Sequence, residues 1–92
     1  MGVSLEWRPA GARKWRYINV GWRSMLYGLL LDAGMLGILD SGDIETLREI
    51  SETQCKGSKD APFDWSQDIA DAIDKLIEAI QKHGDVSVRA LW

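Results

Sequence analysis

The sequence predicts an α+β domain in which a three-stranded antiparallel sheet is packed by three helices, in the order ββαααβ. Apolar and polar residues alternate with a period of two at both ends of the chain, over residues 3–8 and 86–91, as in half-buried strands. Between them, residues 64–83 repeat their apolar positions at helical spacing. The last strand needs a hydrogen-bonding partner, and the N-terminal strands offer free edges. We therefore expect both ends of the chain to lie in one sheet.

The size and composition are those of a single folded domain spanning residues 1–92. The chain has 92 residues, of which 46% are apolar and 27% are charged. These fractions match ordinary globular usage, and the length leaves no room for a second core. Five tryptophans are an unusually large number for so short a chain.

The N-terminal strand is predicted to be half of a β-hairpin. Its core-facing positions are Val3, Leu5 and Trp7. Pro9, Ala10 and Gly11 follow as a turn signal, because proline fixes φ and glycine tolerates positive φ. Apolar residues resume beyond the turn, so we expect strands over 3–8 and 13–18.

The first helix is expected to follow Asn19, a favourable N-cap, and to end at Gly34, a typical C′ residue. Apolar residues fall at helical spacing between these positions. Gly28 stands inside the helix, where glycine costs about 1 kcal/mol relative to alanine. We therefore expect another element to approach the helix closely at Gly28.

Residues 35–39 are interpreted as a short apolar connection to a second helix. Residues 40–43 supply candidate N-caps, and the helix carries a narrow apolar stripe at Ile44, Leu47 and Ile50. Gly57 is the predicted stop, and residues 56–62 have the composition of an exposed loop.

The third helix, over about 65–83, is predicted to be the longest element. One of its faces is apolar and the opposite face is charged. Acidic residues precede lysines by four positions in the pairs Asp71–Lys75 and Glu78–Lys82, an order that stabilises helices. Gly84 follows His83 as a termination signal, and the final strand then runs over 86–91.

No recognisable catalytic, cofactor-binding or metal-binding apparatus is present, so we expect a protein that is not an enzyme. The chain has one histidine, His83, which suits the C-terminus of a helix, and one cysteine, Cys55, which suits a semi-buried apolar position. No ligand cluster has metal-site spacing, and the glycines do not form a phosphate-binding loop.

The expected location is the cytoplasm, with no attachment to membranes. The most apolar stretch, residues 25–39, is interrupted by Asp32 and three glycines and is too short to span a bilayer. It follows a charged segment without a cleavage signal, which argues against a secretory signal peptide. A lone cysteine is consistent with a reducing compartment.

Charge is distributed unevenly along the chain. Residues 1–23 hold five basic residues and one acid, a balance of +4, whereas residues 24–92 have a balance of −7. Basic residues alternate with aromatic ones over residues 14–17, a pattern that can bind single-stranded nucleic acid. Alternatively, the aromatic side chains point to the core and the basic ones to the outer face of the strand.

The preferred function is that of a small non-catalytic interaction domain that occupies a partner protein's surface, as inhibitors of toxins, nucleases or defence complexes do. Single-stranded nucleic-acid binding through the basic aromatic hairpin is the first alternative, and a structural homo-oligomer subunit is the second. Interfaces concentrate binding energy in Trp, Tyr and Arg residues, and we expect at least one tryptophan to stay partly exposed. The predicted contact residues are Arg13, Trp15, Arg16, Arg23 and Trp65.

Overall fold

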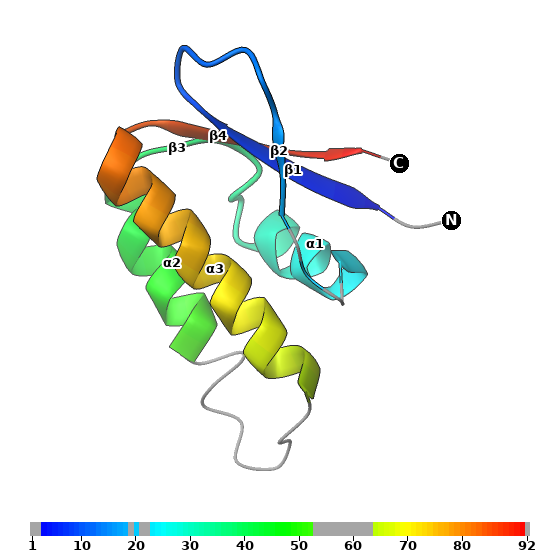
Figure 1. The fold of residues 1–92 in the computed structure, drawn as a ribbon. Helices are drawn as coiled ribbons and strands as arrows, with labels where there is room; N and C mark the ends of the chain where they lie inside the picture. The colour runs from blue at the N-terminus through cyan, green and yellow to red at the C-terminus, as the bar shows by residue number, and fades with distance from the viewer. Residues whose placement is uncertain (1–2, 19, 21–22, 53–63, 92) are drawn as a thin grey trace.

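The structure is a computed structural model that describes residues 3–18, 20, 23–52 and 64–91, with residues 64–66 described only as part of a helix. Figure 1 shows a sheet with helices on one side. The elements in chain order are β1 (Ser4–Pro9), β2 (Arg16–Tyr17), α1 (Arg23–Asp32), β3 (Gly37–Leu39), a 3₁₀ turn (Ser41–Asp43), α2 (Ile44–Ile50), α3 (Asp64–His83) and β4 (Val86–Leu91).

The two terminal strands form the centre of the sheet, which confirms that both ends of the chain belong to it. The strand order is β2-β1-β4-β3, and every neighbouring pair is antiparallel. β1 and β4 pair along their whole length, from Ser4 opposite Leu91 to Pro9 opposite Val86. Six aligned residue pairs bring side chains from opposite ends of the chain onto the same face.

The predicted number of strands is wrong, because the sheet has four strands and not three. The fourth, β3, lies within residues 35–39, which the sequence indicated to be a connection. Only three residues pair with β4, too few to display a period of two. Gly37 has a φ of 133°, and the free edge of β4 supplies the partner for this segment. The pairing depends on tertiary structure, so the element order becomes ββαβααβ.

The hairpin forms with a shorter second strand than predicted. Gly11 takes a φ of 83° in the turn, and the Ala12 N–H donates to the Pro9 carbonyl at 3.1 Å. Residues Arg16 and Tyr17 alone are paired as a strand, and the Ile18 N–H adds a hydrogen bond to the Leu5 carbonyl at 2.9 Å.

The helix ends follow the local signals wherever the structure describes them. Gly34 and Gly84 take positive φ values of 69° and 86° after α1 and α3. Before α2, Asp40 accepts from the Gly42 N–H at 2.8 Å, and Asp43 accepts from the Asp40 N–H at 2.9 Å. Two predicted boundary residues, Asn19 and Gly57, lie outside the described residues.

The prediction of a close approach at Gly28 is wrong. A Cβ atom added at this position would meet no atom within 4 Å, beyond the helix's own backbone. Since Gly28 also lacks a positive φ, neither space nor backbone geometry in the described structure requires glycine there.

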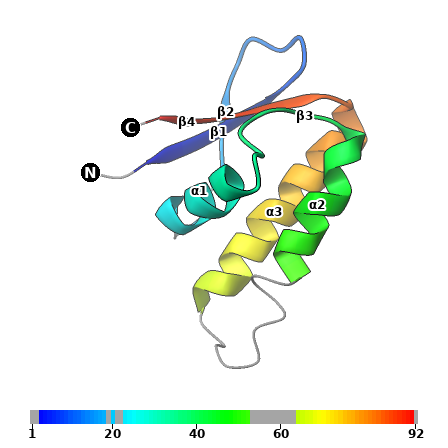
Figure 2. The same cartoon turned by 180° about the vertical axis from the view of Figure 1, so that it is seen from behind.

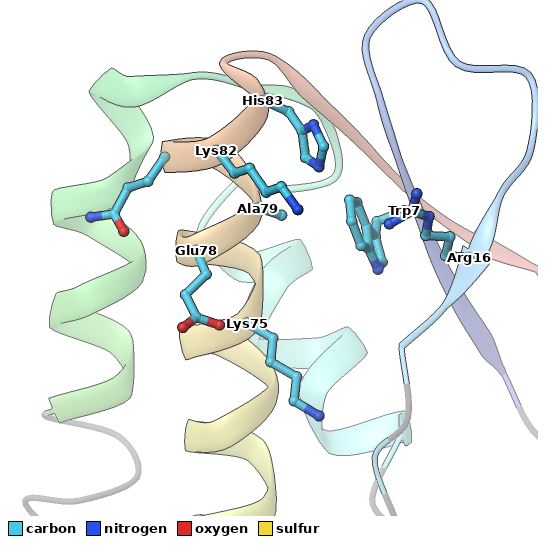
Figure 3. A pocket seen from close by; sticks show the side chains of 8 residues that line it. Trp7, Arg16, Lys75, Glu78, Ala79, Lys82 and His83 are labelled. Atoms are coloured by element: carbon cyan, nitrogen blue, oxygen red, sulfur yellow. The ribbon is translucent and has the colours of Figure 1, made fainter.

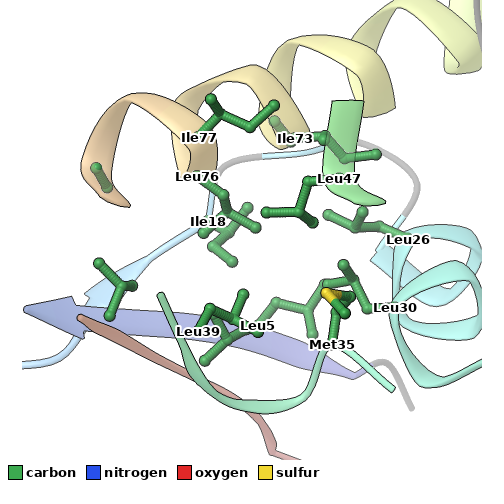
Figure 4. Packing of buried hydrophobic residues seen from close by; sticks show 14 of the residues in the cluster. Leu5, Ile18, Leu26, Leu30, Met35, Leu39, Leu47, Ile73, Leu76 and Ile77 are labelled. Carbon is green, nitrogen blue, oxygen red and sulfur yellow. The ribbon is translucent and has the colours of Figure 1, made fainter. Parts of the chain in front are cut away.

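All three helices lie on the same side of the sheet, and the core fills the space between the two layers (Figures 1, 2 and 4). Leu5 and Val86 face the helices from the central strands, and α3 supplies the largest share of the buried side chains. α1 contributes Leu26 and Leu30, whereas α2 contributes Leu47. The other side of the sheet is covered by no described helix.

Candidate functional site

The uncovered side of the sheet, called here the open face, is assigned from strand register. Residues directly opposite each other in an antiparallel pair project to the same side. Leu5, Ala90 and Val88 belong to the helix side, so their immediate neighbours in sequence belong to the open face. The open face therefore comprises Ser4, Glu6, Arg8, Tyr17, Ile38, Ser87, Arg89 and Leu91.

Trp15 lies against two arginines of the open face. The guanidinium carbon of Arg89 is 3.9 Å from the centre of the Trp15 ring, and that of Arg8 is 4.4 Å away. Both distances are well within the range of cation–π attraction. Trp15 is half-buried, and the core cluster of the described residues does not include it. The connection between β1 and β2 thus places an indole ring on the outside of the sheet.

The buried carboxylate of Glu6 fixes the position of Arg89 in this arrangement. Glu6 Oε1 accepts from Arg89 Nε at 2.9 Å and is also 2.9 Å from Arg89 Nη2. The Glu6 side chain is 8% exposed, whereas that of Arg89 is 41% exposed. A carboxylate this buried needs its counter-charge, so Glu6 holds Arg89 in position beneath Trp15.

Large apolar side chains are exposed around the same face. Tyr17 is 70% exposed, Ile38 is 75% exposed and Leu91 is 43% exposed. The other two large apolar residues exposed in the described structure, Met25 and Leu31, belong to α1. These three residues share the open face but lie apart on it, with Tyr17 and Ile38 on the two edge strands and Leu91 at the end of β4.

The predicted contact residues do not form one cluster. The connection between β1 and β2 rises from the sheet on the side away from the helices (Figures 1 and 2). Arg13 is exposed in this connection, which also carries Trp15. Arg16 is opposite Trp7 and belongs to the helix side, and Arg23 begins α1 in the helix layer. The side chain of Trp65, in α3, lies outside the described residues.

Over residues 14–17 the aromatic side chains do not point to the core with the basic ones outside, as one of the two interpretations of the alternation expects. Tyr17, opposite Glu6, is on the open face, whereas Arg16 extends over the Trp7 ring at 5.1 Å on the helix side. Sequence reasoning missed Arg8, whose period-two relation to Glu6 already indicated this face. It could not find Arg89, because that contact depends on the β1–β4 register.

A separate pocket opens on the helix side, between the hairpin and the C-terminal half of α3. Its volume is about 700 Å³. Trp7 and Arg16 line it from the strands, and Lys75, Ala79, Lys82 and His83 line it from α3 (Figure 3). The pocket and the open face lie on different sides of the sheet and share none of these six side chains.

The described residues contain no group of three or more His, Cys, Asp or Glu side chains able to hold a metal ion. His83 is exposed at the end of α3, with its ring centre 6.2 Å from that of Trp7, and Cys55 lies outside the described residues. Within the part of the chain that the structure describes, no helix is long and apolar enough to cross a membrane. Comparisons with protein-family models, curated proteins and solved structures find no match to this chain.

Proposed function

We propose that this domain is non-catalytic and acts by occupying the surface of a partner protein, with the open face of the sheet as its contact surface. The observation that carries the proposal is the combination of exposed apolar side chains with the Trp15–arginine cluster on that face. Aromatic residues and arginine are the residue types enriched in protein interfaces.

The charges around the open face indicate a partner whose contact surface is acidic. Arg8 and Arg89 lie on the face, and Arg13 and Lys14 are exposed in the adjoining connection. Glu6 is the one acid assigned to this face, and it is already bound to Arg89. Cations on and beside this face favour an oppositely charged protein surface and raise its association rate.

The cluster favours a protein partner over single-stranded nucleic acid. A base that stacks on Trp15 would compete with the two guanidinium groups that already contact the ring. Arg89 is also held by Glu6, so its charge is partly neutralised within the domain. Some aromatic and cationic groups of the hairpin are therefore already engaged in contacts within the domain.

The test is affinity capture from the native host with the full chain as bait, followed by binding measurements with the identified, purified partner. The variant Leu91→Ala removes an open-face side chain that is 43% exposed, and the control Leu31→Ala removes one from α1 that is 52% exposed. We expect Leu91→Ala to weaken binding by about 1–2 kcal/mol and Leu31→Ala to leave it unchanged.

Three outcomes would contradict the proposal. Equal binding losses for both leucine variants would remove the open face as the contact surface. Salt-dependent retention of the pure protein on single-stranded DNA, without a protein partner, would favour the nucleic-acid function. A stable oligomer in light scattering, dispersed by Ile38→Lys, would make the open face a contact between copies of this chain.

A further inference from the structure

The pocket between the hairpin and α3 has an aromatic wall formed by Trp7. The Arg16 guanidinium carbon lies 5.1 Å from the centre of the Trp7 ring, and the His83 ring is inclined to it by 41°. Figure 3 shows Trp7 between His83 and Arg16, with Arg16 on the side away from α3. The Trp7 ring is therefore held by its neighbours while its other side faces the pocket.

The opposite wall is a single face of α3. Lys75, Ala79 and Lys82 are separated by four and three positions, so they lie along one face of the helix. Ala79 is buried, and its short side chain leaves a hollow between the two longer lysines. Figure 3 shows the Lys82 side chain extending toward Trp7 across this hollow.

The pocket is positively charged within an acidic protein. Among the described residues that line the pocket, Arg16, Lys75 and Lys82 are opposed by Glu78, a balance of +2 with His83 neutral, whereas the whole chain carries −3. No carboxylate of the described residues forms an ion pair with Lys75 or Lys82. A net positive charge beside an apolar wall attracts an anion from solution.

We propose that this pocket binds a small ligand with both an aromatic ring and an anionic group, such as a nucleoside monophosphate. The ring would lie against Trp7, and the phosphate would be placed beside the face of α3 that carries Lys75 and Lys82. The pocket is shallow and open to solvent, and its volume of about 700 Å³ leaves room for both parts. This site is independent of the proposed protein contact, which uses the other side of the sheet.

The experiment is a titration of the purified full chain with small ligands. Binding is monitored by calorimetry and by NMR of the backbone and indole N–H groups. Adenosine monophosphate is the probe, and adenosine and ribose 5-phosphate are the matched ligands that lack either the charge or the ring. We expect adenosine monophosphate to bind with a Kd below about 1 mM. Each partial ligand should bind at least about fivefold more weakly, since stacking and ion pairing each contribute.

Charge-neutralising variants locate the site. Lys75→Gln and Lys82→Gln should each weaken adenosine monophosphate binding by about two- to fivefold. Lys14→Gln is the matched control, because Lys14 is an exposed lysine in the β1–β2 connection and does not line the pocket. Glu78→Gln should strengthen binding, because it removes a carboxylate that lines the pocket.

Shifts confined to Trp7, Ala79 and His83 on addition of the nucleotide would support the site. The proposal is overturned by no binding at millimolar nucleotide, or by equal affinity for ribose 5-phosphate and the nucleotide. It is also overturned if Lys14→Gln weakens binding as much as Lys82→Gln. None of these results depends on a protein partner, so failure here leaves the proposed contact surface untouched.

Discussion

Glu6 and Arg89, from strands at opposite ends of the chain, are joined by a hydrogen-bonded ion pair on the open face. Glu6 Oε1 is 2.9 Å from both Arg89 Nε and Arg89 Nη2. Arg89 in turn lies 3.9 Å from the Trp15 ring. The pair therefore links the centre of the sheet to the Trp15 indole ring on its outer side.

Removal of Arg89 should destabilise the fold because it leaves the buried Glu6 carboxylate without its partner. We expect Arg89→Ala to lower the free energy of unfolding by about 1–3 kcal/mol, a range typical of an orphaned buried acceptor. The low half of this range is favoured, since the Arg89 side chain is 41% exposed to solvent. Chemical denaturation measures the change.

The control for this loss is a double-mutant cycle with Glu6→Gln. If the ion pair is responsible, the loss caused by Arg89→Ala should shrink in the Glu6→Gln background, where no buried charge remains. Arg13→Ala, at an exposed position, should change stability by less than about 0.5 kcal/mol. An undiminished Arg89→Ala effect in the Gln background would assign the loss to packing against Trp15.

Two adjacent leucines of α1 test which face of this helix is in the core. Leu30 is fully buried, whereas Leu31 is 52% exposed. Leu30→Ala should therefore lower the free energy of unfolding by about 2–5 kcal/mol, and Leu31→Ala by less than about 0.5 kcal/mol. Similar losses at the two positions, measured by urea denaturation, would contradict the placement of α1 against the sheet.

Two glycines should respond to alanine with opposite signs. Gly84 has a φ of 86° after α3, so Gly84→Ala should destabilise the fold by about 1 kcal/mol or more. Gly28 lies inside α1 with no positive φ and open space around its Cβ position, so Gly28→Ala should stabilise by about 0.5–1 kcal/mol. Thermal unfolding of both variants is sufficient, and destabilisation by Gly28→Ala would show a constraint on α1 that the geometry does not contain.

The long elements could be predicted from sequence, because their periodicity extends over many residues. The periodicity predicts a helix over about 65–83 and a strand over 86–91, and α3 and β4 occupy Asp64–His83 and Val86–Leu91. β3 could not be predicted, since three residues carry no period and its pairing is set by the free edge of β4. The Gly28 interpretation failed because a helix propensity cost does not by itself indicate a packing constraint.

The contact surface was predictable only in part, because it too depends on the pairing of a short strand. Trp15 and Arg13 were expected from residue type, and the structure places Trp15 against Arg8 and Arg89 on the open face. The sides taken by Arg16 and Tyr17 depend on a two-residue strand, whose register follows from pairing with β1. A slip of one residue exchanges the two faces, so local alternation could not decide which side chain is outermost.

The two half-buried tryptophans of β1 and the β1–β2 connection should separate folding from binding. Trp7 packs against the core, so Trp7→Ala should lower the free energy of unfolding by about 3 kcal/mol. Trp15 lies against Arg8 and Arg89 and is outside the core cluster, and two cation–π contacts near the surface are worth about 1–2 kcal/mol together. The melting temperature of Trp15→Ala should therefore be closer to that of the parent than the melting temperature of Trp7→Ala is.

For partner binding, Trp15→Ala should have the larger effect and Trp7→Ala the smaller one. Trp15→Ala should weaken the complex by about 2 kcal/mol or more, because a large indole flanked by arginines has the composition of an interface hot spot. Binding by Trp7→Ala, measured at a temperature where that variant is folded, should be near that of the parent, since Trp7 belongs to the helix side. If Trp15→Ala instead lost as much stability as Trp7→Ala and bound the partner normally, Trp15 would be a structural clamp for Arg89. The contact surface would then have to rest on Tyr17, Ile38 and Leu91 alone.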